Sequence, residues 1–212
     1  MVRLSPGVRR DVILDAAVRV MRRKGMAATT VRDIAHEMGT SSGLIHHYVE
    51  SMDVLLADAF ERAAGEDLQA TRVALAQVSG PVARLRIFFA TYVRAEQDWA
   101  FQLWLDAWAE AARRPALREV SSRLNLAWAA MLERAIRDGV ANGEFRSPDP
   151  AGAAWRILSL VDGLALQVVA HQTIVDRSDM LAWATAATER ELDLPVGSLA
   201  VGSTTGATPP RA

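Results

Sequence analysis

The chain has 212 residues, half of them apolar and 23% charged, which is typical of a soluble globular protein large enough to bury a core. It contains no cysteine, which excludes disulfides, thiolate metal sites and a cysteine nucleophile. The net charge is −1, but residues 1–52 hold eight Lys and Arg against five Asp and Glu, while the remainder holds sixteen against twenty. A basic first quarter on an acidic body indicates that one end meets a polyanion, unless the imbalance is a chance fluctuation.

Helical periodicity runs through nearly the whole chain and strand alternation is absent, so the fold class is predicted to be all-α. Gly25 and Gly39 each follow a helical run, and Pro81 and Pro115 suit the first turn of the next one. The chain starts without the long apolar run of a secretory signal, and charges recur too often for a membrane span, so a cytoplasmic protein is expected. Helices are expected over residues 8–24, 30–38, 42–48, 52–78, 82–98, 100–113, 116–142, 149–173 and 178–192.

Two domains and a tail are expected. Residues 1–50 form a small basic unit of three short helices, and residues 51–194 form a larger body of long amphipathic helices rich in tryptophan. Residues 195–212 have the composition of a disordered tail.

The stretch TTVRDIAHEMGTSSGLIHHYV has the pattern of two short helices joined by a tight turn. Apolar residues repeat at helical spacing on both sides of Gly39, which can supply the left-handed conformation of a sharp turn. Thr30 with Asp33 can cap the first of these helices, and Ser41 or Ser42 can cap the second. The arrangement is that of a helix-turn-helix, although a solvated αα-hairpin with ordinary caps has the same periodicity.

Small side chains at the start of the third helix suit contact with DNA. A recognition helix presents its N-terminal residues to base edges and phosphates in the major groove. A bulky side chain at or just before Gly43 would hold the helix away from the duplex, whereas the hydroxyls of Ser41 and Ser42 can bond a phosphate or a base. The side chains of His46 and His47 are expected to point outward, away from the apolar face of the same helix.

The residues VILDAAVRVMRRKGMAATTVRDIAHEMGTSSGLIHHYVESMDVLL resemble the N-terminal module of TetR-family transcriptional repressors over about 45 positions. The body, with FQLWLDAWAEAARRPALREV, GEF and DGLALQ, is similar to the branch of that family that includes the glycine-betaine regulators. The resemblance implies an all-α homodimer in which each subunit reads half of a palindromic, double-stranded operator. It also implies a repressor that a small-molecule effector, bound by the larger domain, releases from DNA. The family's DNA contacts map onto Thr30, Ser41, Ser42, Gly43, His46, His47 and Tyr48.

The sequence departs from the family pattern at two positions. The family usually has tyrosine where His46 stands and lysine where Met52 stands, and both commonly touch phosphate. Losing a cation weakens salt-dependent affinity for DNA. A protonated His46 would restore part of the charge, while a neutral one would act as a simple hydrogen-bond donor to phosphate.

Several residues of the body are candidates for an effector site. Trp104 and Trp108 lie four residues apart, on one face of a helix, and Asp106 neighbours them. Asp162 stands within the apolar run ILSLVDGLALQVV, where a buried carboxylate needs a partner. With Trp128, these residues suit a cationic effector held by tryptophan faces and carboxylates. A neutral apolar effector, or a structural role in the core, fits the same residues.

The last two predicted helices are apolar on most sides and are expected to form the homodimer interface, unless they complete the core of the monomer. Catalytic motifs such as G-x-S-x-G, the P-loop, H-E-x-x-H and the dinucleotide fingerprint are absent from the sequence, and His171 stands alone in the body. Neither an enzyme nor a cofactor or metal is therefore expected. The remaining alternative is a helical ligand-binding or protein-interaction module that does not bind an operator.

Overall fold

The computed structural model describes residues 5–91, 98–171 and 175–201. Within these ranges every regular element is an α-helix, which confirms the predicted all-α class. Helix ends fall within a few residues of those expected, although the predicted helices 82–98 and 149–173 extend into residues outside the described ranges. The helices are α1 (Pro6–Lys24), α2 (Val31–Glu37), α3 (Ser42–Tyr48), α4 (Met52–Ala76), α5 (Pro81–Thr91), α6 (Asp98–Ala111), α7 (Pro115–Ala141), α8 (Pro150–His171) and α9 (Arg177–Glu191).

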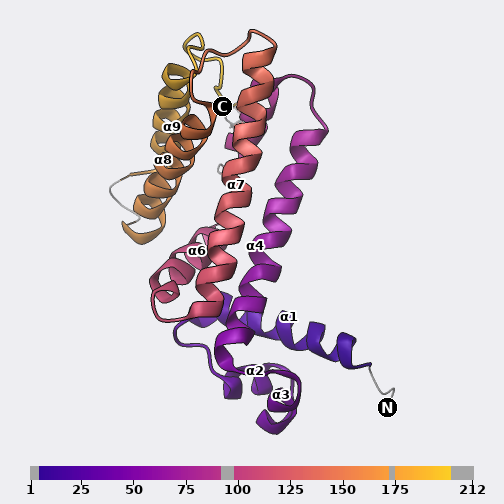
Figure 1. The fold of residues 1–212 in the computed structure, drawn as a ribbon. Helices are drawn as coiled ribbons and strands as arrows, with labels where there is room; N and C mark the ends of the chain where they lie inside the picture. The colour runs from indigo at the N-terminus through magenta and orange to yellow at the C-terminus, as the bar shows by residue number, and fades with distance from the viewer. Residues whose placement is uncertain (1–4, 92–97, 172–174, 202–212) are drawn as a thin grey trace, which may run out of the picture.

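Helices α1 to α3 gather at one end of the molecule, and the long helices extend away from them (Figure 1). Ile13, Ile34 and Ile45, one from each of the three, are fully buried and form the centre of this small unit. Burying such side chains stabilises a unit by about 1.5–3 kcal/mol each. Helices α1, α2 and α3 therefore pack on one another, as their apolar periodicity predicts.

Helix α4 connects this unit to the body. It starts four residues after α3 and runs beside α7 for most of its length (Figure 1). The two helices start close together, where the Asp53 carboxylate accepts a hydrogen bond of 3.4 Å from the Ala116 amide. Further along, Arg123 pairs with Glu61 at 2.9 Å. Helix α4 thus packs in the body along its length and directly follows α1 to α3 in the chain.

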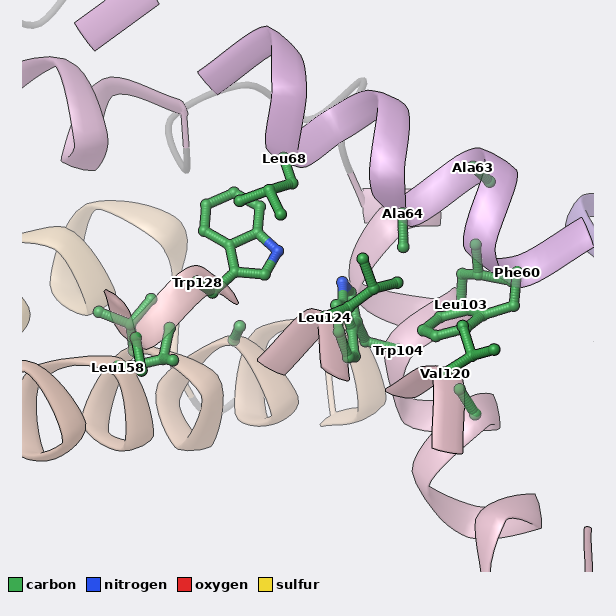
Figure 2. Close-up of a cluster of buried hydrophobic side chains, with 14 of the residues drawn as sticks. Phe60, Ala63, Ala64, Leu68, Leu103, Trp104, Val120, Leu124, Trp128 and Leu158 are labelled. Carbon is green, nitrogen blue, oxygen red and sulfur yellow. The ribbon is translucent and has the colours of Figure 1, made fainter. Parts of the chain in front are cut away.

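The core of the body lies between α4, α6 and α7 (Figure 2). Phe60 packs its ring edge against Trp104, with ring centroids 5.0 Å apart. Leu68, Leu124 and Trp128 continue the same cluster toward α8 and are at most 7% exposed. The aromatic residues of the body thus lie at the meeting point of helices from distant parts of the chain.

The segment after α9 differs from the sequence expectation. Residues 195–201 lie within the described ranges, and Leu199 is fully buried there, although Val196 is 97% exposed. The buried carboxylate of Glu189 accepts hydrogen bonds from the amides of Gly197, at 3.0 Å, and Leu199, at 2.8 Å. Arg86 of α5 donates to the Ser198 carbonyl at 2.6 Å. The predicted tail is therefore wrong for residues 195–201, and residues 202–212 lie outside the described ranges.

Candidate DNA-binding and effector sites

The turn between α2 and α3 has the geometry that a helix-turn-helix requires. Gly39 has φ of 62°, the left-handed conformation expected for it. The Thr40 amide donates to the Ala35 carbonyl at 2.9 Å, which closes the turn after α2. The predicted role of Gly39 is confirmed.

Thr30 and Asp33 form a reciprocal cap at the start of α2. The Asp33 amide donates to Thr30 Oγ1 at 3.2 Å, and the Thr30 amide donates to Asp33 Oδ2 at 3.0 Å, as predicted. Lys24 donates to Asp33 at 2.6 Å, and this bond, with that from the Thr30 hydroxyl, lowers the pKa of Asp33 to about 2. The exposed Thr30 is thereby fixed at the start of α2, with Asp33 ionised at neutral pH.

The start of α3 presents small side chains. Ser41 occupies the N-cap position but makes no side-chain capping bond, so the predicted cap at this helix is wrong for Ser41. Ser42 opens the helix, and neither serine hydroxyl bonds to another residue that the structure describes. Ser41 and Gly43 are exposed, whereas Ser42 is half-buried. The two hydroxyls remain available to an outside partner.

Three residues at the end of α3 complete the predicted DNA surface. His46 and His47 are both exposed, as expected. Tyr48 is half-buried, and its ring meets that of His47 edge-on with centroids 5.0 Å apart. Arg10 donates to the Tyr48 carbonyl at 3.5 Å and pairs with Asp58. All the predicted DNA contacts thus lie at one end of the molecule, on α3 and at the start of α2.

The body contains a cavity walled by α4, α5, α6, α7 and α8. Trp104, Trp108 and Trp128 line it, and they are 9%, 36% and 7% exposed. Trp104 and Trp108 contact each other with ring centroids 5.5 Å apart. Trp128 Nε1 is buried and has no hydrogen-bond partner within the described ranges, which leaves an unused donor in the wall. Asp162 lines the same cavity, so four of the five candidate effector residues are brought together.

Two carboxylates face this cavity. Burial raises the pKa of Asp162 to about 7, and it also raises the pKa of Asp67. Neither side chain bonds or pairs with any residue in the described part of the chain. Among the described residues the lining holds no basic side chain, so nothing there compensates these charges.

Asp67 was not among the residues predicted from the sequence. It lies on α4, seven residues after Phe60 and three after Ala64, both of which are buried. This spacing places Asp67 on the apolar face of the helix. A carboxylate at a position of an apolar stripe was the signal that could have identified it.

Asp106 does not join the cavity, so this part of the effector-site prediction is wrong. Two residues after Trp104, its side chain is turned by about 200° around the helix. Its Oδ2 accepts from the Met26 amide at 2.8 Å, and its Oδ1 accepts from Gln102 at 2.9 Å. Nearby, the Arg22 guanidinium lies 4.0 Å from the centre of the Trp99 ring. The far face of the cavity helix α6 is thus attached to the end of α1.

Comparison with known proteins identifies both parts of the chain. Residues 13–59 match the model of the tetR family of bacterial regulatory proteins, and residues 81–193 match that of the BetI-type transcriptional repressor C-terminal domain. The HTH-type transcriptional regulator BetI of Paraburkholderia phymatum is 30% identical over 172 residues, which are 76% of this chain and 81% of the relative. The BetI of Brucella anthropi is 30% identical over 189 residues, which are 78% of this chain and 96% of the relative.

Solved structures show the same similarity. A transcriptional regulator from Saccharomonospora viridis in complex with choline has a TM-score of 0.80 and 25% identity, and the alignment covers 88% of this chain and 98% of that one. A regulator from Pseudomonas aeruginosa has a TM-score of 0.75 and 26% identity, with 89% and 92% covered. The chain therefore belongs to the TetR family, with a BetI-type C-terminal domain, and is a ligand-responsive, DNA-binding transcriptional regulator rather than an enzyme.

Proposed function

We propose that this regulator is a cytoplasmic homodimer that represses transcription from a palindromic operator and is released by a small cationic effector. The observation that carries the proposal is the cavity of the body, in which tryptophan faces lie together with two carboxylates that no described residue compensates. An indole face attracts an ammonium group, and a carboxylate in a partly desolvated site attracts it further.

On the DNA side, α3 would enter the major groove with its first residues toward the bases. The free hydroxyls of Ser41 and Ser42 suit phosphate or base contacts, and the exposed Gly43 permits a close approach. Thr30 at the start of α2 and the exposed His46 and His47 flank them. Phosphate contacts of this kind set the position of the protein, and base contacts set the sequence preference.

On the effector side, several features favour a cation over a neutral apolar ligand. Asp67 and Asp162 are unpaired among the described residues, and a neutral ligand would leave both carboxylates without compensation. The regulator from Saccharomonospora viridis, similar in fold, was solved in complex with choline, which is a cation that carries a hydroxyl. A ligand oxygen of that type could accept the unused hydrogen bond of Trp128 Nε1.

The homodimer is supported by α8 and α9. Trp155 and Leu160 of α8 are 39% and 37% exposed, and Trp183 of α9 is 50% exposed. By length and composition α8 could cross a membrane, with a mean hydropathy of 1.4 over an 18-residue window, and only 33% of that window is buried within the subunit. A second copy packed on α8 and α9 would cover these side chains in a four-helix interface.

Release would follow from the position of α4 and α6. Both helices line the cavity, and both contact the DNA-binding unit, α4 through the chain itself and α6 through Asp106. Operator binding requires two recognition helices about 34–36 Å apart. An effector that favours a different spacing therefore lowers the population that can bind DNA.

The proposal is tested with the purified protein and the DNA upstream of its own gene. Fluorescence anisotropy should show binding that weakens steeply with salt, and sedimentation should show a dimer. Choline should shift the operator isotherm to higher protein concentration, while an uncharged analogue of the same size, 3,3-dimethyl-1-butanol, should not. Binding without any response to cations would exclude the cationic effector, and failure to bind any duplex would favour a helical interaction module.

A further inference from the structure

The effector cavity carries one carboxylate more than a single cation can pair. Asp67 comes from α4 and Asp162 from α8, so the two enter the same cavity from different helices. A monovalent cation would compensate one of them, and the other would either take up a proton or remain an unpaired charge in a partly desolvated site. A ligand with two positive centres would compensate both.

The size of the cavity adds a constraint. The space open to the centre of a water-sized sphere is about 50 Å³. One water needs about 10–15 Å³ on that measure, so the space corresponds to a few such atoms. An unbranched methylene chain is one such atom wide, whereas a trimethylammonium group is several atoms wide. A small aliphatic ligand fits a space of this size.

The walls fit a methylene chain between two charges. Trp104 and Trp108 offer adjoining indole surfaces, which are apolar toward methylene groups and attractive to an ammonium group. Trp128 is 7% exposed, and its Nε1 has no hydrogen-bond partner. In Figure 2 this nitrogen points toward the side where Leu68 and Trp104 lie. A carboxylate drawn toward a bound ammonium group can accept this hydrogen bond.

We infer that the effector is a short aliphatic diamine, a dication whose two ammonium groups pair with Asp67 and Asp162 while its methylene chain lies against Trp104. The inference rests on the proposed function, because it names the ligand class of the same cavity. It assigns to Asp67 a role in specificity: this carboxylate distinguishes a diamine from a monoamine of equal length.

The test is calorimetric titration of the full-length protein at pH 8 with 1,4-diaminobutane, with n-butylamine as the matched monoamine, and with choline. The diamine should bind at least tenfold more tightly than the monoamine and than choline. The Asp67→Asn variant should lose this advantage while binding of n-butylamine changes less than threefold. Glu66→Gln removes the neighbouring carboxylate, which is 74% exposed outside the cavity, and should keep the full advantage. If Asp67→Asn folds poorly, Asp67→Ser replaces it in this test and should likewise lose the advantage of the diamine.

The outcomes separate this inference from the proposed function. If n-butylamine or choline binds as tightly as the diamine, or if the advantage survives in Asp67→Asn and Asp67→Ser, the diamine assignment is wrong. Release of the operator by choline alone would then leave the cationic effector of the proposed function in place. If no amine binds, both the diamine and the cationic effector are wrong, while operator binding measured in the same samples still reports on the regulator itself.

Discussion

The carboxylate of Asp106 accepts a hydrogen bond from the backbone amide of Met26, across 80 residues of sequence and at 2.8 Å. Met26 follows the end of α1 in the DNA-binding unit, and Asp106 lies on α6, whose opposite face lines the effector cavity. Gly25 lies so close that a Cβ built there would be 3.2 Å from Asp106 Oδ2. One helix thus contacts both the ligand site and the DNA-binding unit.

We expect Asp106→Ala to reduce the communication between the two sites. The variant loses a charge-assisted hydrogen bond and about 1–3 kcal/mol of stability, because the Met26 amide is left without its acceptor. Effector affinity should change less than threefold, because Asp106 is outside the cavity. The ratio of operator dissociation constants with and without saturating effector should fall severalfold. Anisotropy measurements at both conditions give that ratio, and an unchanged ratio would show that α6 communicates by another route.

Met52→Lys should strengthen operator binding. Met52 opens α4 directly after the DNA-binding unit, where the family usually carries a lysine. Each additional phosphate neutralised steepens the slope of log K against log salt by about 0.9. The variant should therefore bind more tightly at low salt and lose affinity more steeply as salt rises. Val73 lies at the far end of α4 and is 50% exposed in the native protein. Val73→Lys adds the same charge there and should leave both the operator affinity and its salt dependence unchanged.

Trp183→Glu should separate the subunits. A charge at this half-exposed position would be buried without a partner in the proposed interface. Sedimentation should show a monomer at micromolar concentration, and operator affinity should fall by roughly a hundredfold or more because two half-sites are no longer bound together. Leu126→Glu is the matched control on α7, where the side chain is 60% exposed, and it should remain a dimer. A dimeric Trp183→Glu variant would place the interface elsewhere.

Asp162→Asn should stabilise the protein at alkaline pH. Burial raises the pKa of Asp162 to about 7, so from about pH 4 to pH 7 the folded state keeps a proton that the unfolded chain releases. Stability of the native protein therefore falls as pH rises through this window and is level above it. At pH 8 the variant should be more stable by about 1 kcal/mol or more, and at pH 4 it should match the native protein.

Urea denaturation at pH 4, 6 and 8 measures this difference, with Glu66→Gln as the control at an exposed position of α4. The same ionisation predicts that a cation binds more weakly at pH 6 than at pH 8, because Asp162 must first lose its proton. A pH-independent stability difference would contradict the raised pKa.

The helices and the DNA-binding unit could be predicted because their signals are local. Gly39 terminates α2 in the conformation that only its lack of a side chain makes easy, and Thr30 with Asp33 forms a cap within four residues. Apolar periodicity then fixes which face of each short helix is buried. These features need no knowledge of the rest of the chain.

The effector site could be predicted only in part, because its members meet through tertiary packing. Nearness in sequence suggested Asp106, but helical rotation turns it away from Trp104 and toward α1. Asp67 lies on α4, whereas the tryptophans that suggested an effector site lie on α6 and α7, so the sequence did not link them. Its position on the buried stripe of α4 marks it only once α4 is known to pack beside Trp104 and Trp128.

The segment after α9 has a practical meaning for anyone who shortens or labels this protein. The match to the BetI-type domain stops at residue 193, so a shortened protein designed on that boundary would lack Leu199 and the amides that satisfy Glu189. The buried carboxylate of Glu189 would then lose both of these hydrogen bonds, and α5 would lose the hydrogen bond from Arg86 to the Ser198 carbonyl. Affinity tags and fluorophores at this end should therefore be attached beyond residue 201. There they leave intact the hydrogen bonds that join residues 197–199 to Arg86 of α5 and Glu189 of α9.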